Sequence, residues 1–509
     1  MTIRNRGPIG EMFTRPMLVM CLWFFSLAGL FGQVENELLS RSFWKGSPDL
    51  EMVQNRMAEG DNPAELDRFS FDALSWALIE KAPENVLLYL LDQPGNDVNK
   101  LTHDGRTYIF WAAYRNNQSF MKTLVSRGAK TDIVDSHGYS LLNFAAVTGQ
   151  TDITLYDFIL AHGAQPAAEV NLNGANALLL LAPFLEDTQL VDYFEGHGVN
   201  MQATDEDGAN FFHYACKGGK ITFLNGLIER GFAPDAMTHD GRNAAHFVAM
   251  ATRGKTNAVE VYQMMDALGV DLTLASQEGK TPLWYALQGD TSAETLAFLM
   301  DLGTDVQQSS DEGENALMVA AYRHEVDVLQ RLISEEVDIN QVDKEGHSAL
   351  SNAVRYNNAE VVSLLLEQGA STAPNANGGT LLKQLAVAHV RDSAAFVEKA
   401  ALLVAHGLDM GRAQPNGNTF FHLAVTENNT GLFDIAREAG ANINHLNQDG
   451  YSALHLAAMQ TQGPEAIKIL IDQGASTDAL TPFEETPWAL AQENEQLNTL
   501  PEILELLEP

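Results

Sequence analysis

The chain has 509 residues, more than one compact core usually contains. Its 45% hydrophobic residues and its lack of biased tracts exclude disorder over most of the length. The 31 basic and 67 acidic residues give a net charge of -36, and such a surface repels phosphate backbones, so nucleic acid is not expected as a partner.

Residues 1–32 have the pattern of a signal peptide. Basic residues precede an uncharged apolar run over 17–31, and acidic residues follow the run. The run is shorter than the ~20 apolar residues that a membrane-spanning helix needs. We therefore expect an exported protein, periplasmic or secreted. An uncleaved N-terminal membrane anchor is the alternative, and it is the only membrane contact that the sequence suggests.

The two cysteines do not suggest a disulfide framework. Cys21 lies in the segment that we expect to be removed, which leaves Cys216 alone in the mature chain. A zinc cluster built on cysteine is excluded for the same reason. We expect Cys216 to be a small packing residue inside a helix.

A repeat of about 33 residues fills the rest of the chain. Its marker is a glycine followed two residues later by Thr, Ser or Asn, and it recurs at Gly105, Gly138, Gly174, Gly208, Gly241, Gly279, Gly313, Gly346, Gly378, Gly417 and Gly450. Degenerate flanking copies place Ser70 and Glu484 at the glycine position, which brings the total to about thirteen copies. Each copy has two apolar stretches at helical spacing, and a glycine ends the second stretch. The pattern predicts a turn, a helix, a short loop and a second helix in each copy.

These segments resemble the ankyrin repeat. "GKTPLWYAL" (279–287) and "GYSALHLAA" (450–458) are similar to its first helix, and "LLLEQGAST" and "ILIDQGAST" are similar to its end. The resemblance implies an all-α solenoid of helix-loop-helix repeats with short hairpin-like tips over 67–480. We expect a capping half-repeat over 33–66 and a C-terminal capping repeat over 481–509. In the fourth copy, Pro183 predicts a distorted first helix.

No catalytic motif is evident along the chain. Phosphate-binding glycine loops, Gly-x-Ser-x-Gly elbows and His-Glu-x-x-His helices do not occur. Residues 204–208, "TDEDG", resemble the start of a calcium loop but lack its later acidic ligands. His213, His246, His422 and His455 share one position of the repeat, where the resemblance implies a hydrogen bond to the neighbouring backbone. We therefore expect neither a catalytic site nor a cofactor or metal.

The resemblance implies a concave surface formed by the tips and the first helices, and we expect a protein partner there. Most tips are acidic or polar, and tyrosine and arginine stand out because these residues anchor protein interfaces. We expect the partner site around 322–356 with anchors at Tyr322, Arg323, Arg355, Tyr356, Tyr114, Arg115, Arg106, Arg242 and Tyr451. The alternative is that these residues are ordinary solvated side chains.

The sequence thus predicts an exported, non-enzymatic protein-binding scaffold of a bacterial cell envelope, with a partner that it does not identify. Two alternatives remain open at this point. One is a calcium-binding or enzyme-associated envelope protein, and the other is a secreted effector that binds foreign proteins.

Overall fold

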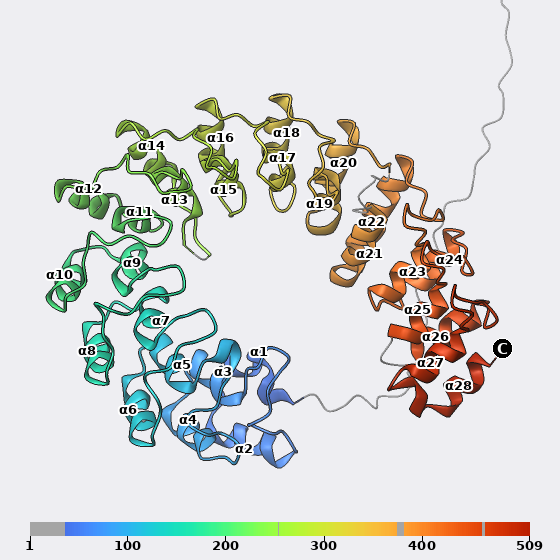
Figure 1. Cartoon of the computed structure of the whole chain (residues 1–509), viewed down its shortest axis with the longest axis horizontal. Coiled ribbons are helices and arrows are strands. Elements are labelled where there is room, and N and C mark those ends of the chain that lie inside the picture. Colours follow the sequence, from blue (N-terminus) through green and yellow to red (C-terminus); the bar gives the residue numbers. More distant parts are fainter. Residues whose placement is uncertain (1–35, 253, 374–380, 461–463, 509) are drawn as a thin grey trace, which may run out of the picture. The chain divides into compact units, whose positions relative to one another are not determined.

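A computed structural model describes residues 36–252, 254–373, 381–460 and 464–508 (Figure 1). The expected signal peptide lies outside these residues. The chain divides into two compact units, residues 1–96 and 97–509. Within the described ranges the regular structure is helical, apart from isolated β-bridges such as Val134 with Ser140 at a tip. This confirms the expected all-α class.

The first unit holds the region that we expect to form the N-terminal cap. Its helices are η1 (Glu37–Leu39), α1 (Arg41–Lys45), α2 (Leu50–Ala58), α3 (Ala73–Ile79) and α4 (Glu84–Leu91). Helix α1 packs on α3, and α2 packs on α4. Trp44 is 1% exposed and donates from Nε1 to the Leu38 carbonyl oxygen at 2.8 Å. Residues 36–66 therefore bury their own apolar side chains against the helix pair that follows.

The second unit consists of helix pairs in chain order. The first helices of the pairs are α5 (Tyr108–Tyr114), α7 (Leu141–Val147), α9 (Ala177–Leu181), α11 (Phe211–Cys216), α13 (Ala244–Met250), α15 (Pro282–Leu287), α17 (Ala316–Ala320), α19 (Ala349–Tyr356), α21 (Leu381–Arg391), α23 (Phe420–Thr426), α25 (Ala453–Gln460) and α27 (Pro487–Glu493). The second helices are α6 (Gln118–Ser126), α8 (Ile153–Ala161), α10 (Gln189–Gly196), α12 (Ile221–Glu229), α14 (Val259–Ala267), α16 (Ala293–Asp301), α18 (Val326–Ser334), α20 (Ala359–Glu367), α22 (Ser393–Ala405), α24 (Leu432–Glu438), α26 (Glu465–Asp472) and α28 (Pro501–Leu507). Short 3-10 helices are η2 (His103–Gly105), η3 (Ala182–Phe184) and η4 (Leu497–Thr499). First helices of successive pairs contact one another, for example α5 with α7 and α13 with α15, and so do second helices such as α16 and α18 (Figure 1).

Each tip in the described ranges turns through a residue in the left-handed region. Gly313 has φ 88°, and a Cβ there would lie 3.2 Å from the Cα of Asp343 in the next tip. The degenerate copies keep this conformation without glycine, because Ser70 has φ 64° and Glu484 has φ 63°. Their φ values show that both residues occupy the glycine position of the repeat, at the cost of about 1 kcal/mol of backbone strain each.

The first helices begin as the marker residues predict. The side chain of Asn315 accepts a hydrogen bond from the backbone of Met318, and Thr281 accepts one from Trp284 in the same way. Pro183 does shorten its helix, since α9 ends at Leu181 and the chain continues as η3. The next repeat accommodates this distortion with Gly218, where a Cβ would lie 2.0 Å from the Pro183 carbonyl oxygen.

The four repeat histidines join neighbouring repeats. His213, His246, His422 and His455 are at most 1% exposed. In each ring Nδ1 accepts from the backbone N–H of the N-cap residue, so Nε2 carries the proton and donates to a carbonyl oxygen further along the chain. The carbonyl acceptors are those of Ala236, Lys280, Tyr451 and Ala479, at 3.0–3.2 Å. The structural role expected for these histidines is confirmed.

A second set of bonds crosses each boundary at the other end of the first helix. The last carbonyls of a helix lack partners within it. Side chains of the following repeat supply the donors: Gln150 to Tyr114 (2.8 Å), His324 to Leu287 (2.9 Å) and Asn357 to Ala321 (3.2 Å). Cys216, inside α11, is fully buried, and burial raises the pKa of its thiol, so it is a packing residue as expected.

We expect acid to lower the free energy of unfolding of the array. Burial lowers the pKa of His246 to about 4, below the 6.5 of an exposed histidine. At a pH between these two values, the unfolded chain therefore binds a proton at His246 that the folded chain does not bind. The stabilisation is complete above pH 6.5 and is lost as the pH falls from there towards 4, by about 3 kcal/mol for this residue.

Melting temperatures between pH ~7.5 and ~5 would test this linkage. We expect a fall for the wild type and a shallower fall for His246→Asn. His197→Asn, which changes an exposed histidine, is the matched control. A His246→Asn curve parallel to that of the wild type would contradict the assignment.

Candidate functional site

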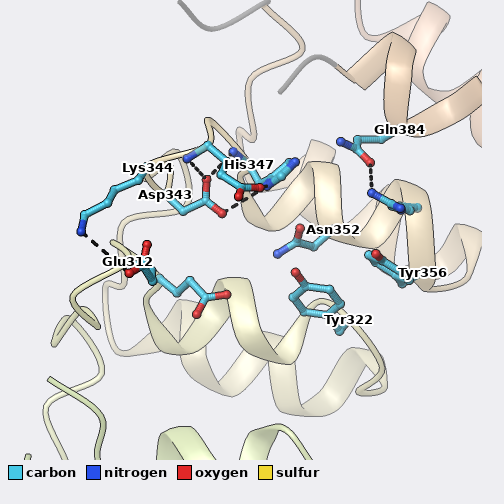
Figure 2. Close-up of a pocket in the computed structure, with 11 residues that line it drawn as sticks. Glu312, Tyr322, Asp343, Lys344, His347, Asn352, Tyr356 and Gln384 are labelled. Atoms are coloured by element: carbon cyan, nitrogen blue, oxygen red, sulfur yellow. Dashed lines mark hydrogen bonds and ion pairs between the residues drawn. The ribbon is translucent and has the colours of Figure 1, made fainter. Parts of the chain in front are cut away.

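The pocket that best fits the expected site lies on three consecutive repeats of the second unit. It has a volume of about 300 Å³ and is lined by Glu312, Glu314, Tyr322, Asp343, Lys344, Glu345, His347, Asn352, Arg355, Tyr356 and Gln384 (Figure 2). We call it the Tyr322 pocket. One wall comes from the tips at 312–314 and 343–347, and the opposite wall comes from Tyr322, after α17, and from residues of α19 and α21. The structure therefore brings together Tyr322, Arg355 and Tyr356, as the sequence predicts.

Two tyrosines form one wall of the Tyr322 pocket. Tyr322 follows the small residues Ala320 and Ala321, and Tyr356 is the last residue of α19. Their ring centroids are 4.8 Å apart at an interplanar angle of 37°. Tyr356 is 39% exposed, whereas Tyr322 is half-buried. Burial, with the nearby Glu314 carboxylate, raises the pKa of Tyr322 to about 12, so its phenol stays protonated at neutral pH.

Arg355 lies against this tyrosine pair. Its guanidinium carbon is 5.0 Å from the centroid of the Tyr356 ring, a stacking distance. Its Nη1 donates to Oε1 of Gln384 at 3.3 Å, across the boundary to α21. Gln384 is only 2% exposed. The packing fixes both ends of the guanidinium, so Arg355 is held in one orientation.

Carboxylates form the opposite wall. Asp343 is held by its own tip, since Oδ1 accepts from the backbone of Glu345 and His347 at 2.9 and 2.8 Å, and Oδ2 lies 3.2 Å from Nδ1 of His347. Glu314 is half-buried, and burial together with Asp343 raises the pKa of its carboxyl. Glu312 lies at the outer rim, 3.9 Å from Lys344. Negative charge therefore faces the tyrosine wall.

Two buried amides complete the pocket, and sequence reasoning missed both. Asn352 and Gln384 are 3% and 2% exposed. They occupy the sixth position after the tip glycine, where the other copies have Trp, Phe, Leu, Tyr or Val, for example Trp111 and Phe144. This substitution of apolar residues in two consecutive copies is the signal that could have found them. Asp343, which also lines the pocket, carries no such signal.

Other expected anchors lie elsewhere. Arg323 is adjacent to Tyr322 in sequence, but its Nη1 lies 3.3 Å from Asp290 and its side chain lines a different hollow, beside Tyr285. Arg115 stacks on Tyr114 at 4.6 Å, several repeats away. Tyr451 is half-buried at its tip, with its ring 6.2 Å from that of His455. The structure therefore does not collect these residues into the Tyr322 pocket.

Arg106 and Arg242 are tied to the repeats themselves, contrary to their expected place as exposed anchors. Arg106 is 9% exposed, its Nε lies 2.8 Å from Asp135, and its Nη1 lies 3.0 Å from Asp104. Arg242 is paired with Asp240 at 2.6 Å and with Asp207 at 3.2 Å. Ion pairs with acidic groups on the same and adjacent tips hold these side chains against the array, so little of their surface is exposed to a partner.

Comparison with known proteins identifies the family. A model of ankyrin repeats in three copies matches residues 74–169 and, in overlapping matches, 212–310, 247–343, 288–376, 317–413, 386–481 and 421–507. The chain belongs to the ankyrin-repeat family. Ankyrin repeats are typically protein-binding modules rather than enzymes, which suggests a protein-interaction scaffold.

Relatives of this ankyrin-repeat protein differ widely. It is 22% identical over 414 residues to the human transient receptor potential cation channel subfamily A member 1, which covers 65% of this chain and 36% of the channel. It is 26% identical over 431 residues to mouse Rabankyrin-5 (73% of this chain, 34% of the relative), and 22% identical over 323 residues to the E3 ubiquitin-protein ligase KEG of Arabidopsis thaliana (55% and 19%). The chain thus spans about a third or less of these relatives, so what they share with it is the repeat array.

Among the described residues, no helix is both long and apolar enough to cross a membrane. No group of three or more His, Cys, Asp or Glu side chains in those same ranges is placed to hold a metal ion. The acidic tip at 204–208 belongs to the described part, and its Asp205 accepts hydrogen bonds from the Ala209 backbone and from the Tyr214 hydroxyl.

The structural role of Arg106 leads to a stability prediction. The Asp135 side chain is fully buried, so Arg106→Met would leave its charge without the guanidinium and cost about 3 kcal/mol of unfolding free energy. A lower urea midpoint for the variant would show this. Arg230→Met, which removes an exposed pair with Asp192, should change the midpoint little. An unchanged midpoint for Arg106→Met would contradict this structural role, and Arg106 would again be a candidate partner anchor.

Proposed function

We propose that the Tyr322 pocket is the principal partner-binding site of this scaffold. The observation that carries the proposal is the coincidence of a tyrosine pair, half-buried Tyr322 and exposed Tyr356, with buried amides at positions that are apolar in sibling repeats. Core packing does not require Asn352 or Gln384, since apolar residues fill the same position elsewhere. Tyrosine and arginine beside a pocket are the usual hot-spot residues of protein interfaces. The partner is a protein, and the array positions the pocket without catalysing a reaction.

Removal of the tyrosine wall tests this proposal. A Tyr322→Ala/Tyr356→Ala variant should lose at least about tenfold in partner capture, because hot-spot residues contribute 2 kcal/mol or more. The measurement is quantitative affinity capture from an extract of the source organism, with mass spectrometry of the proteins retained. Tyr89→Ala/Tyr193→Ala, which removes two half-buried tyrosines from second helices, is the matched control.

Melting curves for both double variants would separate a binding loss from unfolding. Undiminished capture by the folded Tyr322→Ala/Tyr356→Ala variant would place the principal site elsewhere on the array.

We further propose that the scaffold is exported and acts in the cell envelope or outside the cell. The support is the order of basic residues, uncharged run and acidic residues over 1–37. We expect the mature protein to begin near residue 33. Intact-mass measurement of protein from the periplasmic fraction would give that N-terminus. A full-length mass in the membrane fraction would support the anchored alternative, and full-length protein in the cytoplasm would overturn export.

A further inference from the structure

The charge of the Tyr322 pocket selects against anions. Four of its lining residues are carboxylates, namely Glu312, Glu314, Asp343 and Glu345, against Lys344 and Arg355. The Lys344 side chain is 65% exposed at the rim and lies near Glu312. The Arg355 guanidinium stacks on Tyr356 and donates a hydrogen bond to Gln384. The whole chain carries a net charge of -36, which adds a long-range field of the same sign.

The pocket also offers acceptors that lack donors. The Glu314 carboxylate is half-buried, and within the described residues it has neither a hydrogen bond nor an ion pair. Asn352 donates from Nδ2 to the Met318 carbonyl oxygen at 3.0 Å, while its Oδ1 has no donor in that same part of the chain. Asn352 is 97% removed from solvent and lies between Tyr322 and the His347 tip in Figure 2. Neither oxygen is cut off from solvent, so a donor from a partner can reach both, and a cationic donor forms the stronger, charge-assisted hydrogen bond.

The pocket also contains one donor that lacks an acceptor. Arg355 donates to Gln384, and its buried Nε has no acceptor among the described residues. The carboxylates therefore favour a guest with a cationic donor, and the Arg355 guanidinium favours one that also carries an oxygen acceptor. A peptide supplies both, because its backbone carbonyls accept and a Lys or Arg side chain donates.

We propose that the Tyr322 pocket binds a lysine or arginine side chain from an extended basic segment of a protein partner. The cationic group lies against Tyr322, between Glu314 and the Oδ1 of Asn352, and a backbone carbonyl of the same segment accepts from Arg355. This inference rests on the proposed function and names the chemistry of its partner. The tyrosine ring attracts the cation through its face, and the carboxylates attract it through charge.

Other guests fit less well. A metal ion needs converging ligands, and no such group of His, Cys, Asp or Glu occurs in the described ranges. A free polyamine supplies the cation but no acceptor for Arg355. An acidic segment would face the Glu314 and Asp343 carboxylates at close range.

The decisive probe is a hexalysine peptide with an N-terminal benzophenone and a fluorescent label. Its affinity would be measured by fluorescence anisotropy with the full chain near 0.15 M salt, where interactions between distant surface charges are screened. Glu314→Gln should weaken binding about tenfold. Asp449→Asn, which removes one charge from an exposed tip elsewhere, should change it less than about twofold. Photocrosslinks should map to 312–322 and 343–356, and the same peptide with acetylated lysines should not bind.

Arg355→Met separates peptide recognition from plain charge attraction. If only charge matters, removal of this cation tightens the binding of hexalysine. If Arg355 holds a backbone carbonyl, hexalysine binds more weakly, whereas spermine, which has no carbonyl, binds more tightly. Lys344→Met is the matched charge control, and it should tighten both probes slightly.

Equal effects of Glu314→Gln and Asp449→Asn, crosslinks spread over all acidic tips, or tighter hexalysine binding by Arg355→Met would each overturn the inference. The proposed function would survive such a result if Tyr322→Ala/Tyr356→Ala still abolished partner capture. If that variant captured partners normally, the proposed function would fail as well, so the two failures are distinguishable.

Discussion

Hydrogen bonds that cross from one repeat to the next are the interaction on which this structure depends. A single helix pair cannot bury its apolar face, and it leaves backbone groups unpaired at its tip and at its helix ends. The neighbour meets these needs at three levels: tip to tip, as from Lys344 N to Glu312 O at 2.9 Å; through the buried histidines; and through side chains such as Asn357 that reach the last carbonyls of the preceding helix. Stability is therefore a property of boundaries between repeats.

The same inter-repeat bonds explain why residues that resemble a catalytic site have structural roles. Ser452 Oγ lies 2.8 Å from Nδ1 of His455, a distance at which a nucleophile and its base could also lie. Yet Nδ1 accepts from the Ser452 backbone, Nε2 is committed to the Ala479 carbonyl oxygen, and the ring is fully buried. No substrate could reach this pair without separating two repeats. Arg106 and Arg242 follow the same logic, because acidic tips on adjacent repeats hold them in place.

The proposed binding site uses side chains that also take part in inter-repeat bonds, such as Asn352 to the Met318 carbonyl oxygen and Arg355 to Gln384. The Tyr322 pocket spans three consecutive copies. The first two carry Tyr322 and Tyr356, and the last two carry an amide, Asn352 or Gln384, where sibling copies have an apolar residue. Three neighbouring repeats contribute to it, so its geometry is as rigid as the boundaries that join them. An acidic rim and two amides give the pocket a polar lining.

The sequence by itself determined the helices and the tips, because these follow from local patterns that recur along the copies, and the shortened helix at Pro183, because proline ends a helix locally. The resemblance to the ankyrin repeat implied the histidine bonds, which reach 23 to 34 residues along the chain. The sequence also placed Tyr322, Arg355 and Tyr356 in one region, since equivalent positions of adjacent repeats lie side by side. Only the tertiary structure decided that Arg323 turns to Asp290, that Arg106 is buried against Asp135, and that Asn352, Gln384 and Asp343 belong to the pocket. The direction of a long side chain is set by charges and rings on the neighbouring repeat. Those partners lie about 30 residues away, beyond the reach of any local pattern.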